Sequence, residues 1–433
     1  MPGTEAITTP PPGDITQVVE HLFRHEAAKM VSALTRIFGF ENLSLAEDVV
    51  QEALLRALKT WPFYGVPQNP AAWIMQVSKN LAMDVVRREK TFRDKEADIG
   101  ALKVSADSAG ETEVHLAREF TDDRLRMMFV CCHPVVPSEA QIALALKTLC
   151  GFSVGEIARA FLTNEAAVAK RLTRAKQKIR EARIPFEIPG AAELEDRLDT
   201  VLQTLYLLFN EGYKASIGDT LVREELCKEA IRMVSLLVEH PSGNQPRTHA
   251  LLALMLFGTA RLPSRTDADG NLLRLKEQDR TLWDASVIAR GMYHLAMSAS
   301  GNDLSVYHLE AAIAAAHCSA LTYESTDWNH IVALYDMLTH LDDSVIVALN
   351  RAIAVAQMQG ARSGLDALAS IGNQEKLNAY YLYHAAKAEF EMQLQQTDSA
   401  AKHLRKALEL TQIHSEQIFL RSRLRLCEPH VCA

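Results

Sequence analysis

The segment FSVGEIARAFLTNEAAVAKRLTRAKQKIR, residues 152–180, has the pattern of a helix-turn-helix. Ser153 and Glu156 have the spacing of a capping box, which predicts a helix that begins at Val154. Thr163 and Asn164 offer a cap for a second helix. The apolar spacing of that helix predicts a buried face made of Val168, Leu172, Ala175 and Ile179. Its exposed face is expected to carry Lys170, Arg171, Arg174, Lys176, Lys178 and Arg180.

The second helix is strongly basic. Residues 165–183 hold seven Lys and Arg against two Glu, a net charge of +5. A helix of this charge behind a short turn suits the major groove of DNA, where it neutralises phosphates. For this segment taken alone, the alternative is an amphipathic helix whose charges are merely solvated.

The composition of the chain favours an all-α protein. Its 433 residues include 19 Gly and 15 Pro, and Ala and Leu are abundant. The longest apolar run, residues 250–257, is too short to cross a bilayer, and no signal peptide is visible. Seven cysteines without zinc-type spacing indicate a reducing compartment. We therefore expect a cytoplasmic protein with no membrane contact, and no metal site at Cys131-Cys132-His133.

The chain is expected to contain five segments. A disordered leader (1–14) precedes a helical module (15–93), and an acidic linker (94–121) leads to a second module (122–185) that carries the helix-turn-helix. Residues 94–123 hold nine acidic residues against three basic ones. Pro137 to Gln141 has capping-box spacing, and Pro185 and Pro189 close the second module. A long helical region (191–433) follows.

The first module has two amphipathic helices. The helix at residues 46–61 is expected to start from a capping box between Ser44 and Glu47. Its predicted buried stripe is Val49, Val50, Ala53, Leu54, Ala57, Leu58 and Trp61, and its outer face holds Asp48, Gln51, Glu52, Arg56 and Lys59. The helix at residues 69–90 is predicted to bury Ile74, Val77, Leu81 and Val85 and to display Lys79, Asn80, Asp84, Arg87 and Arg88.

The order and spacing of these helices resemble a bacterial RNA polymerase sigma factor of the extracytoplasmic-function (ECF) group. The resemblance covers roughly residues 16–183: AEDVVQEALLRALKTW as region 2.2, AAWIMQVSKNLAMDVVRR as regions 2.3–2.4, an acidic linker, and the region 4.2 helix-turn-helix. The segments NEGYKASIGD, QDRTLWD, STDWNHIVALYD and VALNRAIA resemble the long C-terminal extension of one ECF subgroup, which contains tetratricopeptide (TPR) repeats.

The resemblance implies binding surfaces for core RNA polymerase and promoter DNA. Asp48, Gln51, Glu52 and Arg56 would contact the clamp coiled coil of the β′ subunit. Asn80, Asp84, Arg87 and Arg88 would face the −10 element, with Trp73 as packing support. Ala166, Ala167, Lys170, Arg171 and Arg174 would meet the −35 major groove, and region 4 would contact the β flap. The acidic linker would follow the RNA path of the polymerase.

The recognition helix departs from the commoner family pattern. Gly-Thr-Val-Lys-Ser-Arg opens that helix in many members, whereas this chain has Ala-Ala-Val-Ala-Lys-Arg at residues 166–171. The family's −35 sequence preference is therefore not carried over.

The C-terminal region has two similar segments, residues 348–368 and 382–410. Each reads as a helix, a polar turn and a second Ala/Leu-rich helix, which predicts TPR-like helix pairs. An ordinary helical bundle is the alternative. The acidic charge of this region suggests that it contacts regions 2 and 4 or the polymerase and so modulates activity.

Two other classes of protein stay open from the sequence. The first is a helix-turn-helix activator that binds DNA alone and carries a TPR sensor. The second is an enzyme or ligand-binding domain in the C-terminal half, built around residues 210–213 and 278–280. Against the second class, the sequence has no P-loop, GxSxG, HExxH or EF-hand motif, so we expect no catalysis and no cofactor. His308, His317, His330 and His340 are expected to serve in packing or to be solvated.

Overall fold

The computed structural model describes residues 15–16, 18–19, 22–23, 26–94, 125–161, 163–184, 191–214, 222–267, 271–372, 374–411 and 413–428. These residues form two compact units, 1–204 and 205–433, with the division inside helix α9. The fold is all-α, as predicted, and the described residues contain no strand beyond an isolated bridge between Thr266 and Leu272. The expected leader and most of the expected acidic linker lie outside the described residues. No helix among these ranges combines the length and the apolar character that a membrane span needs.

The first unit consists of helices on both sides of the undescribed residues 95–124. Its elements are α2 (Ala27–Phe38), η1 (Phe40–Asn42), α3 (Leu43–Tyr64), α4 (Pro70–Asp94), α6 (Ser138–Leu149), α7 (Val154–Ala160) and α8 (Glu165–Ala182). Residues 125–131 are also helical, and α9 (Ala191–Tyr213) contributes its first part.

Helix α3 buries most of its predicted stripe: Val49, Val50, Ala53, Leu54, Ala57 and Trp61. The prediction is wrong for Leu58, which is 37% exposed. The predicted capping box at Ser44 is also wrong. The helix already begins at Leu43, so Ser44 lies inside its first turn, and no side chain caps the N-terminus.

Helix α4 packs along a different line from the predicted one. Its fully buried residues are Ile74, Ser78 and Ala82, at intervals of four. Val77, Leu81 and Val85 are only half-buried. The Ser78 hydroxyl donates to the carbonyl of Ile74 at 2.8 Å, so this buried polar group is satisfied within its own helix. The Trp73 ring packs edge-on against Trp61 at 5.5 Å, which confirms its expected packing role.

The helix-turn-helix forms as predicted. The amide of Glu156 donates to the Ser153 hydroxyl (3.1 Å), and the amide of Ser153 donates to the Glu156 carboxylate (2.6 Å). Asn164 caps α8 by accepting from the amide of Ala167 at 2.9 Å. The predicted face of α8 is buried: Val168, Leu172, Ala175 and Ile179.

The capping box predicted at residues 137–141 does not form. Pro137 precedes α6, and no side chain caps this helix. The Gln141 amide instead donates to the carbonyls of His133 and Val136, so it braces the preceding turn.

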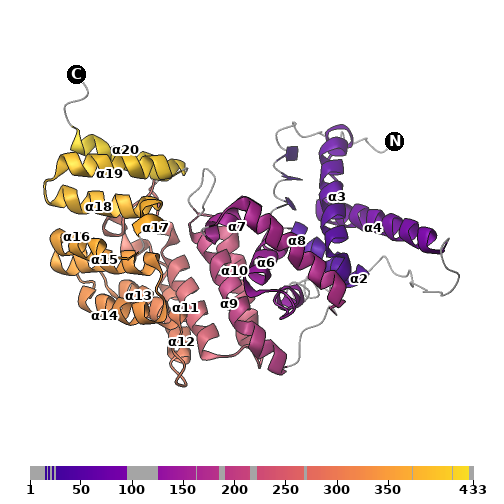
Figure 1. The fold of residues 1–433 in the computed structure, drawn as a ribbon, viewed down its shortest axis with the longest axis horizontal. Helices are drawn as coiled ribbons and strands as arrows, with labels where there is room; N and C mark the ends of the chain where they lie inside the picture. Colours follow the sequence, from indigo (N-terminus) through magenta and orange to yellow (C-terminus); the bar gives the residue numbers. More distant parts are fainter. Residues whose placement is uncertain are drawn as a thin grey trace, which may run out of the picture. The chain divides into compact units, whose positions relative to one another are not determined.

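The second unit is an array of helices that follow one another in chain order (Figure 1). After α9 come α10 (Glu224–Glu239), α11 (Pro246–Ala260), η2 (Leu262–Ser264), η3 (Leu275–Glu277), η4 (Arg280–Leu282), α12 (Ala285–Ser298), α13 (Val306–Ser319), α14 (Trp328–Leu341), α15 (Val345–Gln359), α16 (Ala361–Ala369), α17 (Gln374–Asn378), α18 (Tyr381–Gln393), α19 (Thr397–Leu410) and α20 (His414–Cys427).

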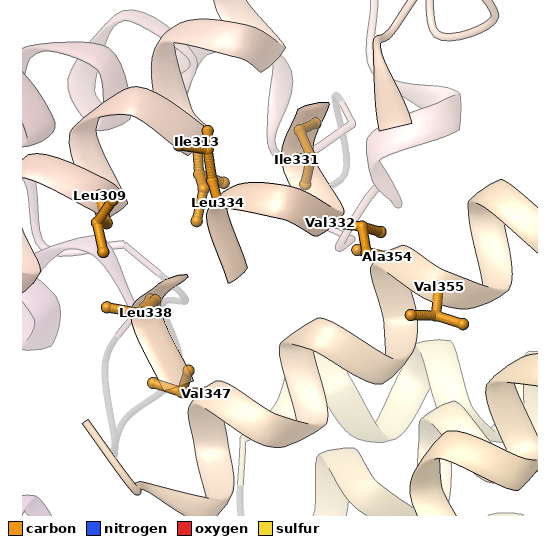
Figure 2. Packing of buried hydrophobic residues seen from close by; sticks show 9 residues of the cluster. All are labelled: Leu309, Ile313, Ile331, Val332, Leu334, Leu338, Val347, Ala354 and Val355. Carbon is orange, nitrogen blue, oxygen red and sulfur yellow. The ribbon is translucent and has the colours of Figure 1, made fainter. Parts of the chain in front are cut away.

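Apolar residues between successive helices hold this array together. Figure 2 shows one such cluster, which joins α13, α14 and α15. Its members are Leu309, Ile313, Ile331, Val332, Leu334, Leu338, Val347, Ala354 and Val355. Because such clusters link helices that lie close together in sequence, the apolar packing of this unit is mostly local.

The two similar C-terminal segments are helix pairs, as predicted. Helices α15 and α16 pack together, and so do α18 and α19. Gly360 between α15 and α16 has φ of +93°, a conformation that favours glycine. A Cβ atom at Gly364 would lie 2.5 Å from the Cβ of Ala356, so a larger residue there would push the two helices apart.

Candidate nucleic-acid and polymerase interface

The outer face of α8 is a basic surface. Lys170 and Arg174 are exposed one turn apart, and Ala166 is exposed at the N-terminal end. Ala167 is half-buried, and its amide donates to the Asn164 side chain that caps α8. Small residues at the start of α8 let the backbone approach a partner closely, while the two cations are placed to neutralise phosphates.

Arg171 differs from its neighbours on α8 because it is only half-exposed. Its guanidinium pairs with the carboxylate of Glu139 on α6 at 2.9 Å. Ion pairs this exposed contribute little stability, so Arg171 can exchange Glu139 for another acceptor. A cleft of about 430 Å³ lies beside this pair, lined by Ser138, Glu139, Ile142, Phe161, Thr163, Arg171 and Gln203.

A second polar face runs along α4. Asn80, Asp84, Arg87 and Arg88 are all exposed. Intervals of three and four place them on one side of the helix. The Gln76 amide donates to the Asn80 side chain at 3.0 Å. The structure therefore brings the four predicted −10 residues together on one surface.

The outer face of α3 combines charge with exposed apolar area. Asp48, Gln51, Glu52 and Arg56 are exposed, and the Arg56 Nε atom lies 3.0 Å from the Glu52 carboxylate. Four apolar side chains of α3 are exposed as well: Leu55 (51%), Leu58 (37%), Phe63 (81%) and Tyr64 (82%). Exposed apolar side chains rimmed by charges mark protein-binding surfaces. Helical periodicity predicted a buried Leu58 and gave no sign that Leu55, Phe63 and Tyr64 are exposed.

Glu47, at the start of α3, joins elements far apart in the sequence. Its carboxylate accepts from the Thr148 hydroxyl on α6 at 3.1 Å and pairs with the Lys176 ammonium on α8. Both charged side chains are mostly buried, 15% exposed for Glu47 and 24% for Lys176. Helical periodicity explained Glu47 as a capping residue and gave no sign of this contact.

Three family models match the chain. Sigma-70 region 2 matches residues 22–92, and sigma-70 region 4 matches residues 126–179. A family of unknown function, DUF6596, matches residues 197–299. The chain therefore contains sigma-70 region 2 and region 4 domains, which support its assignment as an RNA polymerase sigma factor. The first two matches contain every residue of the three faces described above.

Curated relatives of this sigma factor include one that matches nearly its full length. The uncharacterized protein R00370 of Rhizobium meliloti is 38% identical over 406 residues, which cover 91% of this chain and 94% of the relative. "Probable RNA polymerase sigma factor RfaY" of Xanthomonas campestris pv. campestris is 28% identical over 32% of the chain and 34% of its own length. The ECF RNA polymerase sigma factor SigE of Mycolicibacterium smegmatis is 25% identical over 37% of the chain and 60% of its own length. No solved structure matches the chain.

Within this sigma factor, the Glu47 contact joins region 2 to region 4. Glu47 lies in region 2, whereas Thr148 and Lys176 lie in region 4. Contacts of η1 with α8 and of α2 with α6 extend the same interface. The first unit is therefore a closed arrangement of the two regions.

Helix α9 begins on region 4. The Arg197 guanidinium, 6% exposed, donates to the carbonyl of Phe129 at 3.2 Å and pairs with Glu193 at 2.9 Å. Leu194, Leu198, Val201 and Leu202 are buried along the same helix. The first part of α9 is thus anchored to the helix-turn-helix module.

The cysteines of region 4 are packing residues. Cys131 and Cys132 are fully buried. Burial raises the pKa of the Cys132 thiol to about 12, so this group stays protonated and unreactive. The described residues contain no group of three His, Cys, Asp or Glu side chains placed to hold a metal ion.

Proposed function

We propose that this protein is an ECF-type sigma factor that binds core RNA polymerase through α3 and promoter DNA through α4 and α8. The observation that supports this most strongly is the face of α3. An activator that binds DNA alone has no use for exposed Leu55, Phe63 and Tyr64 beside Asp48 and Glu52. A clamp-binding helix needs that combination, because apolar area supplies affinity and charge supplies orientation.

Promoter recognition then divides between two helices. Asn80 and Asp84 on α4 are placed to read bases of the opened −10 element, and Arg87 and Arg88 to hold its phosphates. Lys170, Arg171 and Arg174 on α8 are placed to meet the −35 major groove, beside Ala166 and Ala167. Strand opening costs about 1.4 kcal/mol per base step, so contacts with the opened strand must supply this free energy.

The closed arrangement of regions 2 and 4 must open on a promoter. Elements about 25 base pairs apart are separated by roughly 85 Å of duplex, at 3.4 Å per pair. Regions in contact through Glu47 and Lys176 cannot reach both elements. The thirty residues 95–124 reach roughly 100 Å when extended, which is enough to allow the separation.

The domain boundaries follow from this assignment. We assign region 2 to residues 15–93, the acidic linker to 94–121 and region 4 to 122–185. Residues 191–433 would form a TPR-like extension that modulates the activity of regions 2 and 4, with α9 as the connecting helix because Arg197 anchors it to region 4. An Arg197→Met variant tests the modulation. Its promoter output should change relative to wild type, and unchanged output in a folded variant would argue against control through α9.

Binding to purified core polymerase tests the function. An Asp48→Ala/Glu52→Ala variant should bind core enzyme about tenfold or more weakly than wild type, because two interface charges are lost. A Glu195→Ala/Asp196→Ala variant removes the same charge from an exposed part of α9 and should bind normally. Equal binding by all three proteins would argue against the α3 surface. Specific binding to duplex DNA without core enzyme would favour the activator instead.

A further inference from the structure

Two arginines of the second unit lie over one tryptophan ring. Arg261 ends α11, Arg280 opens η4, and Trp283 follows η4. The guanidinium carbons of Arg261 and Arg280 lie 5.1 and 4.9 Å from the centroid of the Trp283 ring, so they are at most about 10 Å apart. His317, near the end of α13, completes what we call the Trp283 cluster. None of these residues belongs to the surfaces assigned to polymerase or promoter.

The scaffold of the Trp283 cluster is rigid. Trp283 is 6% exposed, and its indole N–H donates to the Ser264 hydroxyl at 2.6 Å. Arg280 donates to the carbonyls of His317 (3.0 Å) and Ala320 (2.7 Å) and to the Thr326 hydroxyl (2.9 Å). His317 lies on α13, which packs against α14 through the apolar cluster in Figure 2, and Thr326 lies just before α14.

The positive charge of the cluster has no counter-ion within the described residues. Neither Arg261 nor Arg280 takes part in an ion pair there. Asp279 and Asp284 lie close to Arg280 in sequence. Each carboxylate, however, accepts hydrogen bonds from backbone amides at the start of the helix that it caps. The negative charge of Glu324 interacts electrostatically with Arg280, but the two side chains do not form an ion pair. Two cations over one ring repel each other unless an anion compensates.

Three buried polar atoms of the cluster lack a hydrogen-bond partner. The Nε atoms of Arg261 and Arg280 and the Nδ1 atom of His317 are buried without a hydrogen-bond partner. Burial and the charges of both arginines lower the pKa of His317 to about 3, so the imidazole is neutral at physiological pH and the surroundings are strongly positive. Buried donors without acceptors call for an explanation, and a bound anion supplies one.

Arg261 and Arg280 have different roles in this arrangement. Both terminal nitrogens of Arg280 donate to protein acceptors. Arg280 therefore contributes positive charge to the site rather than hydrogen bonds to a bound anion. The guanidinium of Arg261 makes no hydrogen bond to the described residues, and a planar fork of this kind binds an oxyanion through two parallel bonds.

We propose that the Trp283 cluster is a binding site for a doubly charged oxyanion, the phosphoryl group of a phosphate ester, held by the fork of Arg261. A dianion matches the two unpaired cations in charge, whereas a carboxylate would leave one of them uncompensated. Arg261, Arg280 and Trp283 lie within the residues matched by the family of unknown function, and His317 lies after them. It would give the second unit a ligand of its own, whether or not the protein acts as a sigma factor.

Calorimetric titration of the full-length protein with inorganic phosphate, at neutral pH and constant ionic strength, tests the proposal. Phosphate should bind saturably at one site per chain, and sulfate should compete because it carries the same charge on the same shape. Acetate should bind much more weakly. Heat changes that never saturate would overturn the proposal, and acetate that binds as tightly as phosphate would overturn the preference for a dianion.

Three variants identify the residue that holds the anion. Arg261→Met keeps the stem and removes the charge, and it should weaken phosphate binding about tenfold or more. Arg290→Met removes an exposed arginine from α12 and should bind like wild type. Arg261→Lys keeps a charge without the fork and should lie between the two. Wild-type affinity in Arg261→Met would overturn the assignment. If that variant does not fold, wild-type affinity in Arg261→Lys would overturn it.

Discussion

Replacing Lys176 by Met should make this sigma factor bind core RNA polymerase more tightly. The change removes the ammonium that pairs with Glu47 across the interface of regions 2 and 4. Met keeps most of the packing of the lysine stem. A hydrogen bond between charged groups contributes about 1.5–3 kcal/mol, and partial exposure of both side chains lowers this to roughly 1–2 kcal/mol.

The expected gain follows from the cost of opening. If regions 2 and 4 must separate on the polymerase, the free energy that holds them together opposes binding. Weakening the closed form by roughly 1–2 kcal/mol should raise core affinity by about 5- to 30-fold, since 1.4 kcal/mol corresponds to a factor of ten. The Thr148–Glu47 hydrogen bond stays in place, so the first unit should still fold.

Competition binding to core enzyme measures the effect. The matched control is Lys178→Met, which removes an exposed charge from the same helix and should bind like wild type. Glu47→Gln combined with Lys176→Met should gain little beyond either single change, because both remove the same contact. Equal core affinity for Lys176→Met and Lys178→Met would refute the argument that this contact holds the protein closed.

Two further predictions concern the −35 surface and acid stability. Arg174→Ala should cost the polymerase complex roughly 1–3 kcal/mol on DNA with an intact −35 element, and less on a scrambled element; Arg180→Ala at the far end of α8 is the control, and equal losses on both DNAs would mean that Arg174 contributes charge alone. The second unit should lose stability as pH falls below 6.5, because burial first, and then Arg261 and Arg280, lower the pKa of His317 from 6.5 to about 3. The unfolded chain therefore binds a proton that the folded chain excludes between these values, at an upper limit of about 1.4 kcal/mol per pH unit. Acid unfolding of His317→Asn should be less steep across this range, and an unchanged slope would contradict the assignment.

Sequence reasoning predicted the helix-turn-helix well because its determinants are local. The capping box joins Ser153 and Glu156, which are three positions apart, and Asn164 also reaches an amide three positions away. Burial on α8 follows helical spacing because one face of this helix packs on its own module. The same locality explains why the helix pairs of the second unit were predictable.

The predictions from sequence were wrong where a neighbouring element determines the start of a helix or which of its residues are buried. Ser44 has ideal capping spacing, but the preceding η1 turn continues into α3 and leaves Ser44 inside the helix. The fully buried residues of α4 include the small residues Ser78 and Ala82, whereas the larger Val77, Leu81 and Val85 are only half-buried. Neither effect is visible in the periodicity of a single segment.

For the candidate surfaces, the sequence predicted which side chains of each helix are exposed, but not which residues of different elements contact each other. Exposure of Asp48, Asn80 and Lys170 follows from amphipathicity. The Glu47–Lys176 contact joins residues 129 positions apart, which no local pattern encodes. The Trp283 cluster likewise assembles from residues at or next to α11, η4 and α13. The sequence indicated residues 278–280 as a possible part of an enzyme or ligand-binding domain, but gave no sign that Arg261 and His317 join them.

Transcription by purified core polymerase supplemented with this protein tests the central claim most directly. The template should carry the DNA upstream of the gene for this protein, and transcript ends should be mapped. The account predicts start-site-specific transcripts that require the protein and that are lost when Asn80 and Asp84 on α4 are both changed to Ala. Core enzyme that gives the same transcripts with and without the protein would contradict the account.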